Sequence, residues 1–379
     1  MHNENNYPGK EWALLELTAL VFNGSLEPEA LKSFLSGNSI DWGEVIRQGM
    51  RQRMLPLLSY VLTLEEIFDL IPPYLVELFT ASLGLNKHIA RIQDQEAAVV
   101  IKAFNDAAIN FVNTKGIVFD KTIYRSLGVR KSGDIDFMVE PKYKKEVELI
   151  LRELGALPGH YDAKLKKILG LDEKYVRLYN LTPAQMPHHV KPVKDFLVQA
   201  VDIDINFELT WFGSPYKVPT EEALKEKVWV SVPGERDIKI PSFSIAYQFL
   251  YTILHLFKEA WVESYRLLDD EGGDVALQQF LDVFMLFTAY RQELLRSNFH
   301  RIVMRYDLVK PTLWVLGHTE QLFAVQMVKD LGFKEDVSPG WLCSWQSPGG
   351  KIGQWKGTMR ERLKAKNCKP LFINNFSIR

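Results

Sequence analysis

Cysteine is scarce in this sequence, which has only Cys343 and Cys368 among its 379 residues. Two cysteines cannot build a framework of several disulfides, and they are too few for a zinc site made of cysteines. Such scarcity is typical of proteins that work in a reducing compartment. We therefore expect a cytoplasmic protein, and the class of small disulfide-stapled secreted domains is excluded.

An excess of charge of either sign is also missing. The chain has 46 basic and 47 acidic residues, which gives a formal net charge of -1. Proteins that bind long nucleic acids usually carry a basic surface, because the phosphates they contact have to be neutralised. We therefore do not expect a nucleic acid as partner, although this balance is compatible with a local basic pocket for a phosphate.

Long hydrophobic runs are absent as well. The most apolar window covers residues 245–257, only 13 residues, and it contains Gln248 and His255. A membrane-spanning helix needs ~20 apolar residues, so this window predicts a buried helix. The first six residues, Met-His-Asn-Glu-Asn-Asn, have neither the basic end nor the apolar core of a signal peptide. We expect a soluble protein with no membrane association.

The residues that are present indicate a globular chain with three regions. Hydrophobic residues make up 47% of the chain and charged residues 25%, an ordinary globular composition. Apolar residues recur at helical spacing over most of an N-terminal region, 1–100, and of a C-terminal region, 216–379. Between them, region 101–215 changes character, and we expect it to hold the core. No role is assigned to residues 300–379.

Two segments of this core region have the pattern of strands. Residues 135–139 form a short apolar run before a proline, and an amphipathic helix follows over 142–154. Residues 199–209 alternate apolar and acidic side chains, which predicts a strand with one buried face. A helix between two strands indicates an α+β or α/β core.

Residues 86–113 are predicted to form one long helix that Lys115-Gly116 ends.

The strongest chemical signal is a pair of aspartates at the start of the first strand, in the motif Gly133-Asp134-Ile135-Asp136. Residues two apart on a strand share a face, so both carboxylates point the same way with ~6–7 Å between their Cα atoms. This arrangement can hold divalent cations such as Mg²⁺, which prefers oxygen ligands. The alternative is a pair of solvated acids at a strand end. Unpaired charge beside an apolar strand is costly, which favours the metal site.

The second strand offers a third carboxylate. Asp202, Asp204 and Glu208 lie on its polar face, and the distance from the first to the last is ~20 Å of strand. These acids therefore cannot all reach one metal, and only one can be level with Asp134 and Asp136. Three carboxylates on two adjacent strands are what a two-metal phosphoryl-transfer site requires.

Two further segments bear on ligand binding. Lys115-Gly116 lies at the predicted helix end, where a glycine lets backbone N–H groups approach a phosphate and a lysine adds charge. A plain helix-capping glycine is the alternative reading. We interpret His188-His189 as surface histidines; if their segment pairs beside the acidic strand, one of them could contact a phosphate or the acceptor.

Together these residues resemble a known family. Residues 113–116 (Asn-Thr-Lys-Gly), 123–125 (Ile-Tyr-Arg) and 130–139 (Arg-Lys-Ser-Gly-Asp-Ile-Asp-Phe-Met-Val) are similar to the signature of the uncharacterised nucleotidyltransferase family, within the DNA polymerase beta-like superfamily. Residues 208–211 (Glu-Leu-Thr-Trp) match a later element of that family, except that Thr210 replaces its usual histidine. The resemblance covers about residues 40–290. It implies an α+β fold, in which a small mixed sheet with helices is flanked by N- and C-terminal helical regions.

The resemblance also implies roles for individual residues. Asp134 and Asp136 would coordinate Mg²⁺ (or Mn²⁺) that bridges the phosphates of a nucleotide. Glu208 would be the third carboxylate, as metal ligand or as general base, with Asp204 the competing choice and Asp202 a weaker one. The phosphate-contacting set would be Lys115, Gly116, Arg130 and Ser132. Because Thr210 stands where the family usually has a histidine, the resemblance does not assign the residues on the acceptor side of the pocket.

Three functions are compatible with this set. The first is an enzyme that transfers a group from an NTP to a hydroxyl or phosphate of a small molecule or peptide. The second is a glycosyltransferase on the same fold that uses a nucleotide-sugar donor, for example a UDP-sugar, to tailor a peptide. The third is a non-catalytic nucleotide-binding protein, against which the intact carboxylates argue. The Lys-Gly pair and the Arg-x-x-x-Asp-x-Asp spacing favour the nucleotidyltransferase fold, and a fold by itself does not fix the reaction.

Overall fold

A computed structural model describes residues 9–181, 184–231, 239–262, 275–334, 337–346, 350–365 and 369–372. The chain divides into two compact units: Leu85–Tyr251 forms one, and Met1–Gly84 together with Thr252–Arg379 forms the other. Two helices, α6 (Pro73–Asp106) and α11 (Ile245–Phe257), contribute residues to both units. The first and last parts of the chain thus belong to one unit, and the middle forms the other.

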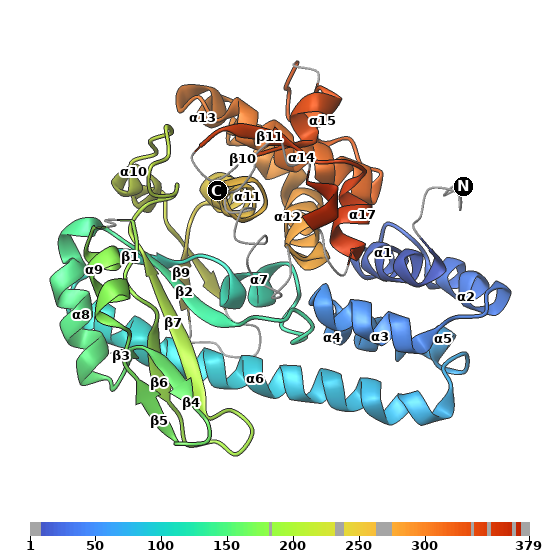
Figure 1. Cartoon of the computed structure of the whole chain (residues 1–379), viewed down its shortest axis with the longest axis horizontal. Coiled ribbons are helices and arrows are strands. Elements are labelled where there is room, and N and C mark those ends of the chain that lie inside the picture. Colours follow the sequence, from blue (N-terminus) through green and yellow to red (C-terminus); the bar gives the residue numbers. More distant parts are fainter. Residues whose placement is uncertain are drawn as a thin grey trace. The chain divides into compact units, whose positions relative to one another are not determined.

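The middle unit is built on a seven-stranded mixed sheet with the strand order β3-β6-β7-β2-β1-β9-β8 (Figure 1). Its strands are β1 (Phe111–Asn113), β2 (Asp134–Val139), β3 (Leu157–Pro158), β6 (His189–Pro192), β7 (Ala200–Asn206), β8 (Val228–Ser231) and β9 (Lys239–Ser242). β2 pairs with β7, and β1 with β9, in parallel; the other neighbours are antiparallel. The expected α+β class, a mixed sheet with helices, is confirmed.

The two predicted strands are the central pair of this sheet. β2 is buried along its whole length after Asp134, which is why it reads as an unbroken apolar run. β7 alternates, with its apolar residues buried and Asp202, Asp204 and Asn206 on the other face. β7 ends at Asn206, earlier than the predicted strand, because Phe207 N–H donates instead to the carbonyl of Ala184, at 2.8 Å.

The predicted long helix at 86–113 is wrong at its C-terminal end. α6 stops at Asp106, and residues 111–113 form the short strand β1. Phe104 of α6 packs against Phe111 of β1 and Phe137 of β2, with ring centroids 5.2 and 5.4 Å away. This aromatic cluster joins α6 to the sheet. A strand of only three residues shows no period, so its sequence extends the helical pattern as easily as it forms a strand.

Further elements complete the middle unit. Its helices are α7 (Gly116–Thr122), which lies beside β2 in Figure 1, α8 (Lys144–Glu153), α9 (Glu173–Leu181), α10 (Thr220–Lys225) and the short 3₁₀ turn η2 (Pro141–Tyr143). Strands β4 (His160–Asp162) and β5 (Lys167–Leu169) form a separate hairpin. The amphipathic helix expected over 142–154 is thus η2 followed by α8, with Val147 and Leu151 buried.

The other unit is mainly helical. Its elements are α1 (Lys10–Asn23), α2 (Pro28–Gly37), α3 (Trp42–Arg51), α4 (Leu55–Leu62), α5 (Glu65–Phe68), a π-helical turn (Lys258–Val262), α12 (Leu277–Arg296), α13 (Phe299–Arg305), α14 (Val309–Phe323), α15 (Met327–Asp330), α16 (Pro339–Leu342), β10 (Ser344–Gln346), β11 (Ile352–Gln354), α17 (Met359–Lys364) and a 3₁₀ turn (Lys369–Leu371). Buried Glu16 of α1 accepts a hydrogen bond from Arg360 of α17 at 2.7 Å, which joins these two helices.

The described residues can be compared with two expectations from the sequence, one about disulfides and one about membrane spans. Cys343 forms no disulfide within the described residues, and Cys368 lies outside them. Among the helices of the described segments, none combines the length and the apolar character needed to cross a membrane.

Candidate functional site

The parallel register of β2 and β7 assembles three carboxylates. Asp134 lies opposite Asp202, and Asp136 lies opposite Asp204. Carboxylate oxygens of Asp134, Asp136 and Asp204 all lie within 4.8 Å of one another. We call these three residues the carboxylate cluster.

Asp136 is the buried member of the carboxylate cluster. It is 3% exposed, and its Oδ1 lies 3.0 Å from Nζ of Lys115. Burial, and then the negative charge of Asp134, raise the pKa of Asp136 to about 7, although the Lys115 ammonium acts in the opposite direction. Negative charge at this position is therefore costly, and a cation close to the cluster would relieve it.

His188 pairs with the cluster from its other side. It precedes β6, which is antiparallel to β7, and its Nδ1 forms an ion pair with Oδ1 of Asp204. That contact raises the pKa of His188. The segment therefore does pair beside the acidic strand. His188 is exposed, as expected for a surface histidine. His189 is buried, and its Nδ1 lies 2.7 Å from the carbonyl oxygen of Pro187. The prediction that His189 lies on the surface is therefore wrong.

Lys115 and Gly116 lie in the turn from β1 into α7, which differs from the helix end expected from the sequence. Gly116 has φ +33°, and a Cβ there would lie 3.1 Å from Oγ of Ser132 and 3.3 Å from the carbonyl oxygen of Asp134. A side chain would thus be both strained and crowded. The glycine lets the turn pack directly against the segment that leads into β2.

Arg130 and Ser132 belong to that segment. Nη1 of Arg130 donates to Oγ of Ser132 at 2.7 Å, and the guanidinium lies over the Phe119 ring at 5.2 Å. From α6, the Asn86 side chain donates to the carbonyls of Gly128 and Arg130 at 2.7 and 3.0 Å. The predicted phosphate-contacting set is therefore brought to one side of the carboxylate cluster, since Gly116 packs on Ser132 and Lys115 pairs with Asp136.

Glu208 lies beyond the end of β7. Within the part of the chain that the structure describes, it is not a member of the carboxylate cluster, which contains Asp204 instead. Its assignment as third carboxylate or general base stays a prediction. The sequence had placed Asp204 and Glu208 on one face of one strand, and only the register with β2 distinguishes them.

Tyr251 is a neighbour of the site that had no signal in the sequence, where it reads as part of an apolar helix. Burial raises the pKa of its phenol, and the charges of Lys115, Asp136 and Asp204 also act on it. It lies on α11, far along the chain from the other site residues. No residue pattern within α11 predicts this placement.

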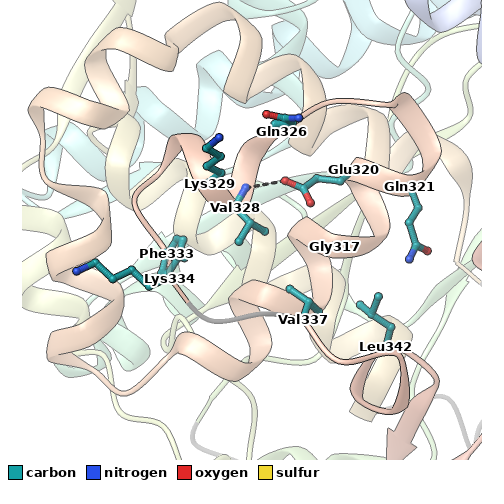
Figure 2. Close-up of a pocket in the computed structure, with 10 residues that line it drawn as sticks. All are labelled: Gly317, Glu320, Gln321, Gln326, Val328, Lys329, Phe333, Lys334, Val337 and Leu342. Carbon is teal, nitrogen blue, oxygen red and sulfur yellow. Dashed lines mark hydrogen bonds between the residues drawn. The ribbon is translucent and has the colours of Figure 1, made fainter.

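A separate hollow of about 570 Å³ lies in the other unit (Figure 2). Its lining comes from α14 to α16 and consists of Gly317, Glu320, Gln321, Gln326, Val328, Lys329, Phe333, Lys334, Val337 and Leu342. In Figure 2 the Glu320 carboxylate points toward Val328, whose backbone N–H donates to it at 2.7 Å. No residue of the predicted site lines this hollow.

The ligand atoms that the carboxylate cluster offers fit a hard divalent cation. It offers carboxylate oxygens from two strands, and oxygen ligands suit Mg²⁺ and Mn²⁺. A bound cation would also stabilise the negative charge of Asp136, which burial disfavours. Asp134, Asp136 and Asp204 are thus the residues that could hold such a metal.

A family model described as uncharacterised nucleotidyltransferase matches residues 38–324, which is more than half of the chain and includes the carboxylate cluster and the Lys115-Gly116 turn. No curated protein and no solved structure matched the chain. The family expected from the Asp-Ile-Asp motif is confirmed. The chain belongs to the uncharacterised nucleotidyltransferase family.

Proposed function

We propose that this protein is a metal-dependent enzyme that transfers a nucleotidyl group from an NTP to a hydroxyl or phosphate of a small molecule or peptide. Membership of a nucleotidyltransferase family supports a transferase that uses a nucleotide. The single observation that carries the finer proposal is the carboxylate cluster, formed on register-matched strands beside the Lys115-Gly116 turn.

The metal-binding residues in this proposal are Asp134, Asp136 and Asp204, with Glu208 as the alternative third carboxylate. When bound, Mg²⁺ or Mn²⁺ would offset negative charge on the attacking and leaving oxygens. Lys115 lies within 3.0 Å of Asp136, so its ammonium can contact a phosphate held at the cluster. Arg130 adds a second positive charge on the same side, and Ser132 holds its guanidinium in place.

The donor and the acceptor are proposed to approach from opposite sides. Lys115 follows β1, the neighbour of β2, whereas His188 precedes β6, the neighbour of β7. Lys115 with Arg130 therefore defines a donor-phosphate side, and His188, paired with Asp204, defines an acceptor side. A carboxylate of the cluster would accept the proton of the attacking hydroxyl.

A cytoplasmic location stays a prediction from the scarcity of cysteine.

The test is thermal unfolding against a panel of NTPs and nucleotide-sugars, each with and without Mg²⁺. A ligand present at 100 times its Kd adds ~2.7 kcal/mol to the free energy of unfolding, which is a readily measured shift. Wild type is compared with Asp136→Asn, and with Asp202→Asn as the matched control. Asp202 is an exposed aspartate on the same strand as Asp204 but outside the carboxylate cluster.

We expect a Mg²⁺-dependent shift with an NTP in wild type and in Asp202→Asn, and no shift in Asp136→Asn. The NTP that gives it is then incubated with acceptors, and release of pyrophosphate is measured. A shift with nucleotide-sugars alone would replace nucleotidyl transfer by glycosyl transfer. A shift with NTP but no turnover with any acceptor would favour a non-catalytic nucleotide-binding protein. An equal shift in wild type and Asp136→Asn would contradict the site itself.

A further inference from the structure

The turn that holds Lys115 and Gly116 is anchored on both of its sides. Thr114, the residue before them, donates its backbone N–H to the carbonyl of Asp136 at 3.2 Å, which ties the turn to β2. The carbonyl of Thr114 accepts a second hydrogen bond, from Nε2 of Gln248. The two hydrogen bonds together hold the backbone of Thr114, the residue directly before Lys115.

Gln248 belongs to α11 and is 3% exposed. Its side-chain carbonyl accepts from Oγ of Ser242 at 3.2 Å. Ser242 is the last residue of β9 and pairs with Asn113, the residue before Thr114. The carboxamide thus spans from one strand end to the turn beyond the neighbouring strand, and both of its polar groups are engaged. A buried amide satisfied at both ends has one orientation.

This bond bears on the direction of Lys115. The carbonyl of Thr114 and the N–H of Lys115 belong to one planar peptide unit, so holding the carbonyl also orients the Lys115 N–H. Lys115 has φ −120° and ψ −137°, outside both helix and ordinary strand geometry, and Gly116 follows with φ +33°. Such a backbone persists only when its surroundings determine it.

We propose that Gln248 is a positioning residue for donor binding: through the Thr114 carbonyl it holds the Lys115-Gly116 turn in the conformation that receives the diphosphate of the donor. The inference rests on the proposed function. It extends the site to α11, more than a hundred residues along the chain. Gln248 is not a metal-binding residue, so its loss should affect phosphate binding and leave the metal affinity of the carboxylate cluster unchanged.

The test uses two probes, Mn²⁺ alone and inorganic pyrophosphate in the presence of saturating Mn²⁺, both measured by calorimetry. Pyrophosphate represents the diphosphate that NTPs and nucleotide-sugars share. The main variant is Gln248→Met, which keeps the size of the side chain and removes its hydrogen bonds. Its matched control is Gln278→Met, since Gln278 is a 2% exposed glutamine on α12 of the other unit. Ser242→Ala is a second, milder variant that retains Gln248.

We expect Gln248→Met to bind Mn²⁺ like wild type but pyrophosphate about tenfold more weakly, the size of effect that loss of one well-placed buried hydrogen bond produces. Ser242→Ala should show a smaller loss in the same direction, and Gln278→Met no loss. If Gln248→Met does not fold, an unchanged pyrophosphate affinity in Ser242→Ala overturns the proposal.

The two proposals fail in different ways. Equal pyrophosphate affinity in wild type and Gln248→Met overturns the positioning role alone, and so does a parallel loss of Mn²⁺ and pyrophosphate affinity. Wild-type protein that binds neither probe overturns the proposed function, and the positioning role with it.

Discussion

Asp136 on β2 lies directly opposite Asp204 on the parallel strand β7, and carboxylate oxygens of both belong to one cluster with Asp134. This pairing makes Asp204 the third carboxylate that the geometry favours. Each of the two aspartates also has a basic side chain as partner: Lys115 forms an ion pair with Asp136, and Nδ1 of His188 contacts Asp204.

The first prediction separates Asp204 from Glu208. We expect Asp204→Asn to weaken Mn²⁺ binding about a hundredfold, as loss of a ligand would. Glu208→Gln should leave the affinity within about twofold, because a charge outside the cluster is largely screened. Calorimetric titration with Mn²⁺ measures both variants under one condition. The opposite result, a loss in Glu208→Gln alone, would restore Glu208 as the third ligand.

The second prediction concerns the close contact at Gly116. Gly116→Ala places a Cβ 3.1 Å from Oγ of Ser132 on a backbone with positive φ, so the backbone is strained and Ser132 has to yield by a few tenths of an ångström. We expect the free energy of unfolding to fall by about 1–3 kcal/mol and the Mn²⁺-dependent affinity for pyrophosphate to fall as well. Chemical denaturation and calorimetry measure the two effects.

Gly133→Ala is the control for this change, because no atom lies within 4 Å of a Cβ built there. It sits next to Ser132 in the same segment and should bind pyrophosphate like wild type. If both alanine variants lose affinity for pyrophosphate equally, the loss comes from a general disturbance of the segment. The close contact between Gly116 and Ser132 would then not be its cause.

The third prediction concerns pH and the helical unit. His318 on α14 is buried, and its Nε2 donates to the carbonyl of Leu342 at 3.0 Å. Burial lowers the pKa of His318 to about 3, whereas an unfolded histidine titrates near ~6.5. Between these values the unfolded state binds one more proton. This residue therefore makes the free energy of unfolding fall as pH drops below ~6.5, by up to about 1.4 kcal/mol per pH unit.

The measurement is urea denaturation of wild type and His318→Gln between pH 7.5 and 5. Glutamine retains an N–H donor but does not titrate, so the variant should lose stability less steeply toward pH 5. The exposed His160, changed to Gln, serves as control and should follow wild type. Identical slopes for wild type and His318→Gln would contradict a neutral buried His318.

The strands of the site differ in how far the sequence predicts them. β2 and β7 were expected, because a buried run after an aspartate pair and a strict alternation are strong periodic signals. β1 was missed, since its three residues Phe111–Asn113 are too few to show a period. The sequence therefore indicates a helix end at Lys115-Gly116, whereas the structure places these residues between β1 and the start of α7. Their role in phosphate binding stays a prediction.

The histidines show the same limit. His188 and His189 are adjacent in the sequence and have the same side chain, yet His188 pairs with Asp204 whereas His189 is buried. Neighbouring residues on a strand face opposite sides of the sheet, so the difference follows once β6 pairs with β7. That pairing is a contact between separate segments, and composition does not reveal it.

Strand periodicity is enough to place Asp134 and Asp136 on one face, because the period of a strand is a local property of the backbone. Its motif also determined the family. Three contacts appear only in the folded chain: Asp204 completes the carboxylate cluster, His188 contacts Asp204, and Gln248 of α11 donates to the Thr114 carbonyl. These three contacts depend on strand register and on packing between segments far apart in the chain. Such relationships are set by the folded whole and leave no local pattern to read.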